Sequence, residues 1–175
     1  MGRPPEGAGA CPHRRPAARS PARGADHRPA RRRAQGRVVT SFYLDTSVGI
    51  HVLLGHPGAT SWFDEVTASG VHEVLSSRLL RTELTRTLRR LGQPLERREA
   101  VLDHLGTVLL DHTVLVEAEA IGPHVKTLDA IHLASALRSG IEDVVVTSHD
   151  RTMLTVARAL GLAAHDPLTD GSPPP

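Results

Sequence analysis

The chain has 175 residues, 39% of them hydrophobic and only 2% aromatic, so it can form one domain whose core is built from Leu, Val, Ile and Ala. Its single cysteine, Cys11, excludes an internal disulfide framework and any Cys-rich zinc site. The formal net charge is +2; because the chain shows neither an apolar run of roughly 18 residues nor a signal-peptide pattern, we expect an intracellular, cytoplasmic protein that does not enter a membrane.

The small net charge conceals a strongly basic start. Residues 1–37 carry ten arginines and two acids, a net +8, which leaves 11 basic and 17 acidic residues, a net −6, in residues 38–175. The basic segment is rich in Pro, Gly and Ala and lacks apolar periodicity, so we expect it to be disordered. Three interpretations stay open: a tail that attracts nucleic acid, an Arg-rich targeting segment, or a stretch outside the mature protein, with translation starting near Val38.

From residue 38 onwards, short apolar runs alternate with amphipathic stretches. The expected elements in chain order are a strand over 38–45, helices over 47–55 and 59–70, a strand over 71–77, helices over 78–92 and 95–106, a strand over 107–111, helices over 114–122 and 127–140, a strand over 142–148 and a helix over 151–161; residues 162–167 are compatible with an edge strand. This alternation predicts an α/β domain over 38–168 with a central, mostly parallel sheet flanked by helices, and a disordered tail over 169–175.

Two helix starts are predicted from residue type. Thr60 or Ser61 is expected to begin the second helix, and Thr127 is expected to be the N-cap of the helix over 127–140. The helix over 78–92 carries a leucine stripe that is expected to face the core, formed by Leu80, Leu84, Leu88 and Leu91.

Four acids stand out by their places on these elements. Asp45 and Asp150 follow predicted strands, where parallel sheets bind their ligands. Glu83 and Asp129 lie beside the apolar stripes of two helices. Because carboxylates that are brought together repel one another, and because Mg²⁺ and Mn²⁺ prefer oxygen ligands, this set indicates a divalent cation site.

Four segments carry a family resemblance: "FYLDTS" (42–47), "SSRLLRTELTRTLRRLG" (76–92), "LDAIHLASALRSG" (128–140) and "VVVTSHDRTMLTVARALGL" (144–162). In this order and on these elements, they resemble the PIN-domain ribonucleases and, within them, the VapC toxins of bacterial toxin–antitoxin pairs. The resemblance spans roughly residues 40 to 165 and implies a PIN-like α/β/α sandwich. The arginine-rich start lies outside the family pattern.

The resemblance also implies roles for individual residues. Metal ligands and catalytic acids are expected at Asp45, Glu83, Asp129 and Asp150, with supporting hydroxyls from Thr46, Ser47, Thr147 and Ser148. The family commonly has Thr-x-Asp at the fourth acid, whereas this chain has Ser148-His149-Asp150. This departure leaves open which hydroxyl acts, and whether Asp150 binds metal directly or through water.

The implied function is an Mg²⁺- or Mn²⁺-dependent endoribonuclease, the toxin of a type II pair, in which a metal-activated water hydrolyses RNA. The implied partners are RNA, a small VapB-like antitoxin and a second copy in a homodimer. Arg86 and Arg90 share a helix face with Glu83 and are expected to hold the RNA backbone or the antitoxin.

Other interpretations compete with this one. The chain is also compatible with a catalytically silent PIN-like RNA-binding or regulatory module, or with a phosphotransferase that uses Asp45 as a covalent nucleophile. Purely structural roles also exist: Asp45 and Asp150 as helix N-caps, Asp129 as a first-turn acid, Glu83 as the ion-pair partner of an arginine. His132, one turn after Asp129, suits either a hydrogen bond at the edge of the core or support of the site.

Overall fold

The computed structural model describes residues 1–2, 39–68, 70 and 72–172. Its strands are β1 (Ser41–Leu44), β2 (Glu73–Ser77), β3 (Gly106–Val108), β4 (Val145–Thr147) and β5 (Ala163–His165). They form one sheet in the order β3-β2-β1-β4-β5, in which every neighbouring pair is parallel. The predicted α/β class is therefore confirmed, and the edge strand is present as β5. The predicted disorder of residues 1–37 falls, apart from residues 1 and 2, outside the described residues.

The helices follow the predicted order, with local corrections. They are α1 (Thr46–Leu53), α2 (Pro57–Ala68), α3 (Arg78–Arg90), α4 (Glu99–Leu102) after a 3₁₀ turn η1 (Leu95–Arg98), α5 (His112–Ala120), α6 (Thr127–Leu137) and α7 (Arg151–Ala159). The predicted start of α2 at Thr60 or Ser61 is wrong, because Pro57 opens the helix at a position where its fixed φ fits. Thr127 is the first residue of α6 and not its N-cap, which is Lys126. None of the described helices is long and apolar enough to span a lipid bilayer.

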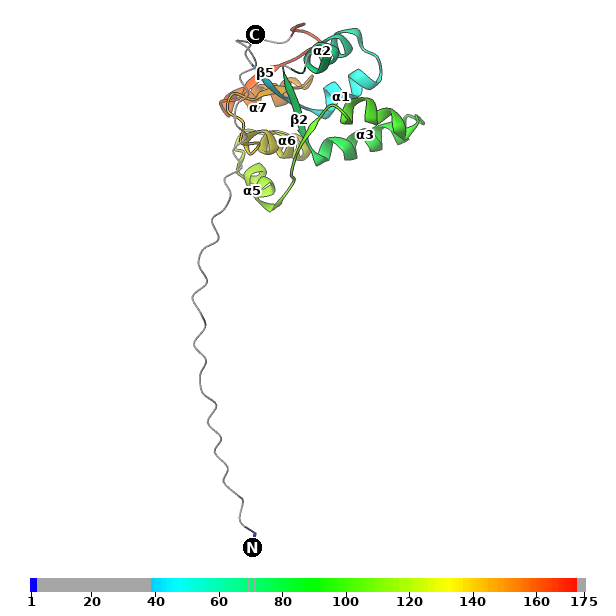
Figure 1. Ribbon diagram of the computed structural model, residues 1–175. Coiled ribbons are helices and arrows are strands. Elements are labelled where there is room, and N and C mark those ends of the chain that lie inside the picture. The colour runs from blue at the N-terminus through cyan, green and yellow to red at the C-terminus, as the bar shows by residue number, and fades with distance from the viewer. Residues whose placement is uncertain (3–38, 69, 71, 173–175) are drawn as a thin grey trace.

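The sheet is covered on both faces, and the alternation of strand side chains assigns each residue to a face. Phe42 and Leu44 belong to the cluster under α1, α2 and α3, whereas Tyr43 belongs to the cluster with Leu133 of α6 and Met153 of α7. Figure 1 shows α1 and α3 on one side of the molecule and α5 and α6 on another. The layered α/β/α arrangement follows from strands that are apolar on both sides.

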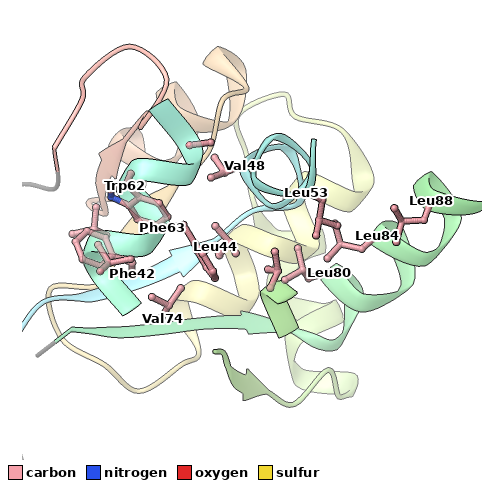
Figure 2. Packing of buried hydrophobic residues seen from close by; sticks show 14 residues of the cluster. Phe42, Leu44, Val48, Leu53, Trp62, Phe63, Val74, Leu80, Leu84 and Leu88 are labelled. Carbon is pink, nitrogen blue, oxygen red and sulfur yellow. The ribbon is translucent and has the colours of Figure 1, made fainter. Parts of the chain in front are cut away.

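The first cluster is the larger one, and Figure 2 shows it between α2, α3 and the sheet. Trp62 and Phe63 of α2 reach toward Phe42, whose ring meets Trp62 edge-on at a centroid distance of 5.5 Å. Along α3, Leu80, Leu84 and Leu88 are buried as predicted. Leu91, the C-cap of α3, is 45% exposed, so the prediction that it faces the core is wrong.

The carboxyl ends of β1, β2 and β4 are joined by hydrogen bonds that bring their polar residues together. The amide of Asp45 donates to the Thr147 carbonyl (2.9 Å), and the Ser76 hydroxyl donates to the Leu44 carbonyl (2.7 Å). After β5, a turn is closed by bonds from Thr169 and Asp170 to the Asp166 carbonyl, so the predicted domain boundary at residue 168 falls inside this turn. These strand ends together form a polar edge of the sheet.

Candidate active site

Asp45 ends β1 and is the N-cap of α1. Its Oδ2 accepts hydrogen bonds from the Ser47 amide (3.2 Å), the Ser47 hydroxyl (2.6 Å) and the Ser148 hydroxyl (2.8 Å). Asp45 as a whole residue is only 5% exposed. Because all three bonds fall on Oδ2, Oδ1 remains the oxygen for a ligand. The structural role as a cap and a ligand role are thus compatible, one on each oxygen.

Glu83 is held by two donors from other elements. Its Oε2 accepts from the Thr46 hydroxyl at 2.6 Å and from His132 Nε2 at 2.9 Å. Burial alone would raise the pKa of Glu83, but the bonds from His132 and Thr46 outweigh it and bring the pKa below its ordinary value. Glu83 is therefore ionised, with Oε1 left for a ligand. The donors in these two bonds are Thr46 and His132, and not an arginine as the alternative interpretation of Glu83 expected.

His132 is almost fully buried, and both of its ring nitrogens contact other side chains of the site. Nδ1 lies 3.0 Å from the Tyr43 hydroxyl, which also accepts a hydrogen bond from the Ser77 amide (3.2 Å). Because a carboxylate accepts hydrogen bonds, Nε2 carries the N–H that donates to Glu83, and this nitrogen lies 3.9 Å from Asp45 Oδ1. His132 thus takes both roles considered for it: it is a hydrogen-bonded residue of the core that also orients Glu83.

Three of the four predicted hydroxyls donate to the acids. Thr46 serves Glu83, and Ser47 serves Asp45 while accepting from the His149 amide at 2.9 Å. Ser148 donates to Asp45 and accepts from the Asp150 amide at 3.0 Å, so it links two of the acids. Thr147 is fully buried, and its hydroxyl has no hydrogen-bond partner among the described residues. At the departure from the family pattern, the hydroxyl that contacts the acids is therefore Ser148.

Asp150 is the N-cap of α7 and has both carboxylate oxygens engaged. Oδ1 accepts from the amides of Thr152 (2.8 Å) and Met153 (3.1 Å), and Oδ2 lies 3.2 Å from Lys126 Nζ. Burial would raise the pKa of Asp150, but the amide of Met153, the Lys126 ammonium and the amide of Thr152 bring it below its ordinary value. Asp150 is thus the acid with the least freedom to bind a cation.

Asp129, in the first turn of α6, is the acid that lacks compensation. Its Oδ2 is buried without a hydrogen-bond partner in the described part of the chain. Burial, followed by the negative charges of Asp45 and Asp150, raises its pKa above the ordinary value, against a smaller opposing effect of Lys126. Asp45, Asp129 and Asp150 therefore lie close enough for their charges to interact, and His132 links Glu83 to them.

These residues suit a divalent cation by chemistry, but they are not preassembled around one. Within residues 39–172, apart from 69 and 71, no three His, Cys, Asp or Glu side chains are grouped closely enough to hold a metal ion as they stand. A cation would compete with existing hydrogen bonds at Asp150, whereas Asp129 Oδ2 has none to lose. An unpartnered buried carboxylate oxygen beside two further acids is the feature that a hard cation relieves.

Two contributors were not predicted from the sequence. Lys126 contacts Asp150, and the pKa of its ammonium is raised by that bond and then by the charges of Asp150, Asp129 and Asp45. In the sequence, the only indication of this role is that Lys126 lies three residues before Asp129. Tyr43 lies in the strand predicted over 38–45, and nothing in its apolar neighbours indicates that its hydroxyl reaches His132. Arg86 and Arg90 lie on α3 and are both exposed, so their predicted binding role stays a prediction.

Replacing Lys126 by Met is expected to tighten Mn²⁺ binding to the purified protein up to about fivefold, the range that a solvent-exposed ion pair gives. The change removes a positive charge from the acids and releases Asp150 Oδ2. Isothermal titration calorimetry measures the effect, and Lys126→Arg, which keeps the charge, serves as the matched control. Equal affinities for all three proteins would show that Lys126 does not oppose a cation.

The chain is similar in sequence to proteins of a known family. The PIN domain family model matches residues 42–159, which include all four acids. The chain belongs to the PIN-domain family. Over 131 residues it is 34% identical to Ribonuclease VapC47 of Mycobacterium tuberculosis (strain CDC 1551 / Oshkosh), covering 71% of this chain and 96% of the relative. It is 30% identical to Ribonuclease VapC46 of the H37Rv strain, covering 74% of this chain and 99% of that protein.

Solved structures support the same PIN fold. The crystal structure of VapBC2 from Rickettsia felis, bound to a DNA fragment from its promoter, superposes with a TM-score of 0.55 at 12% identity. The match covers 73% of this chain and 98% of the solved one. At this identity the match shows the fold alone. Together with the family model and the two VapC relatives, this confirms the expected resemblance to PIN-domain proteins of the VapC type.

Proposed function

We propose that this PIN domain is a metal-dependent endoribonuclease, the toxin of a type II toxin–antitoxin pair. The observation that supports it most directly is Asp129, whose buried, unpartnered oxygen faces the repulsion of Asp45 and Asp150. The two relatives named ribonucleases support the substrate class. A site that concentrates uncompensated negative charge is costly to fold, and cation binding is the function that explains the cost.

The site residues would have different roles. Asp45 through Oδ1, Glu83 through Oε1 and Asp129 through Oδ2 would hold Mg²⁺ or Mn²⁺, because their other contacts leave these oxygens. When bound, the cation supplies a water of lowered pKa and offsets charge on the phosphate. Asp150 would act through water or after release from Lys126, while Ser148 and His132 fix the orientation of Asp45 and Glu83.

The experiment is incubation of the purified full chain with total RNA and Mg²⁺ or Mn²⁺, with and without chelator. Cleavage that requires the metal and yields 5′-phosphate ends is expected. Cleavage that persists in chelator would reject metal dependence. RNA binding without cleavage in either metal would instead support the catalytically silent RNA-binding module. Phosphorylation of Asp45 during the reaction would favour the phosphotransferase.

An antitoxin partner is supported by an apolar surface between α1 and α3. This surface is lined by Ile50, Leu53, Leu54, Leu84, Thr87, Leu88 and Leu91. Leu54 is 54% exposed and Leu91 45%, which suits cover by an apolar segment of a partner. The solved VapBC2 complex contains a protein of this fold together with its VapB partner. The homodimer stays a prediction, which light scattering of the purified protein would test.

Replacing both Arg86 and Arg90 by Ala is expected to weaken RNA binding and to lower the slope of log Kd against log salt concentration by about 1.4, the value for loss of two phosphate contacts to a single strand. The exposed arginines share the α3 face of Glu83 and would reach phosphate oxygens. Fluorescence anisotropy at several salt concentrations measures the slope. Arg158→Ala, at an exposed arginine of α7, is the control. An unchanged slope in the double variant would remove both arginines from the RNA path.

A further inference from the structure

Three histidines from two parts of the chain meet beside the acids. The ring of His51, on α1, lies edge-on to His56 at a centroid distance of 5.3 Å and to His149 at 5.2 Å. We call His51, His56 and His149 the histidine cluster. His56 and His149 are exposed and His51 is half-buried, so the rings present a surface to solvent.

The cluster is fixed in place by a buried carboxylate. Asp166, after β5, is 5% exposed, and its Oδ2 lies 2.9 Å from His149 Nδ1. Its Oδ1 accepts from the Leu168 amide at 3.0 Å, so the carboxylate is itself held. Because a carboxylate accepts hydrogen bonds, His149 donates to Asp166 through Nδ1–H, and Nε2 is the ring nitrogen that is left for a ligand. The ring of His149 is therefore preorganised, although its side chain is 41% exposed.

The cluster is connected to the acids through one hydroxyl. The His149 amide donates to Ser47 Oγ at 2.9 Å, and the same hydroxyl donates to Asp45 Oδ2 at 2.6 Å. His149 also stands at the variable position of the Ser148-His149-Asp150 segment. A polynucleotide whose phosphate lies at Asp45 and Asp129 would thus bring a neighbouring nucleotide to these rings.

The central ring of the cluster, His51, suits a base better than a phosphate. Burial, followed by the positive charges of His149 and His56, lowers the pKa of His51 below its ordinary value, which favours its neutral form. A neutral imidazole ring offers a flat π-face and hydrogen-bonding nitrogens. Proteins that bind single-stranded RNA stack its unpaired bases on such rings, including histidine.

We propose that the histidine cluster binds the nucleobase next to the scissile phosphate and so influences where RNA is cut. This inference rests on the proposed ribonuclease function. His149 supplies a fixed ring through Asp166, and His51 and His56 extend the surface toward the end of α1. The three side chains act in positioning, since none of them contacts the acids through its ring in the structure.

The test separates the ring of His149 from its bond to Asp166. His149→Asn keeps an N–H donor for Asp166 but loses the ring, whereas His149→Phe keeps a ring but loses the donor. If the ring binds a base, His149→Asn and His51→Ala each raise the KM for single-stranded RNA by about tenfold, the loss of one stacked base, and alter the mapped cut sites. His149→Phe then retains more affinity than His149→Asn. His112→Ala, an exposed histidine at the start of α5, is the control.

A merely structural role gives the opposite order, with His149→Asn like wild type and His149→Phe impaired and less stable in thermal unfolding; that order would overturn the proposal. So would unchanged KM and cut sites in His51→Ala and His149→Asn while wild type cleaves, a result that leaves the ribonuclease intact. If wild type cleaves no RNA, the proposed function fails separately. In that case anisotropy of a fluorescent single-stranded RNA, measured in chelator on the same variants, decides the cluster: weaker binding supports it and equal binding rejects it.

Discussion

Asp129→Asn is expected to lower metal-dependent RNA cleavage by at least about 100-fold, the scale of losing a key electrostatic group from a catalytic site, while making the metal-free protein more stable at neutral pH. The two effects have one cause. Asp129 carries a charge that its surroundings do not compensate, because Oδ2 is buried without a partner and Asp45 and Asp150 lie nearby. Asparagine removes the charge that would hold a cation and also the charge that opposes folding.

The sign of the stability change follows from the raised pKa of Asp129. An acid whose pKa is higher in the folded than in the unfolded chain adds stability below the unfolded value, and this addition is lost as the pH rises through the folded value. At neutral pH the metal-free wild type has lost it. Since Asp129 is partly exposed, the gain for Asn is at most about 1 kcal/mol, or about 2–4 °C in Tm for a domain of this size.

Thermal unfolding in chelator, at neutral pH and near pH 4, measures the stability effect, and the advantage of Asp129→Asn should shrink at the lower pH. Cleavage assays with Mn²⁺ measure the other effect. Asp64→Asn, at an exposed position of α2, is the matched control and should change neither. Full cleavage by Asp129→Asn would reject the proposed site, and a less stable variant would show that Asp129 is compensated in solution.

The fold could be predicted from the sequence because the spacing of apolar residues reflects which side chains are buried. Apolar runs that alternate with amphipathic stretches permit little except a parallel sheet covered on both faces, and the observed strand order places Asp45 and Asp150 at one edge. Boundaries were less well predicted. The strand predicted over 107–111 ends at Val108 in the structure, and Leu109 beyond it is 79% exposed. Local residue type did not indicate where strand pairing stops.

The contacts inside the site were beyond sequence reasoning because they join distant residues through single atoms. Lys126 and Asp150 are paired across 24 positions, and Tyr43 and His132 across 89. Periodicity assigns Tyr43 to the core, which is correct for its ring, but it does not indicate where the hydroxyl points. Such pairs follow only from the packing of α6 against the sheet, so the sequence identified the acids without the groups that orient them.

His132→Ala is expected to destabilise the protein by about 3–5 kcal/mol, the range for removing a buried ring, and to reduce cleavage. The imidazole is 1% exposed and connects Tyr43 to Glu83. Its loss leaves a cavity, and it also takes from Glu83 one of the two donors that together outweigh burial and keep the pKa of this carboxyl low. Glu83 would then be less ionised and less oriented.

Chemical denaturation measures the stability loss, and a double-mutant cycle with Glu83→Gln separates packing from the hydrogen bond. We expect a coupling energy of about 0.5–3 kcal/mol between the two positions, as for residues in one network. His104→Ala, at an exposed histidine whose ring meets Phe63, is the control for losing an imidazole. Additive effects of the two changes would contradict the bond between His132 and Glu83. The Tyr43 hydroxyl lies 3.0 Å from Nδ1 of the same ring whose Nε2 donates to Glu83. Tyr43→Phe should therefore weaken this coupling without opening a cavity, so the network that orients Glu83 extends back into β1.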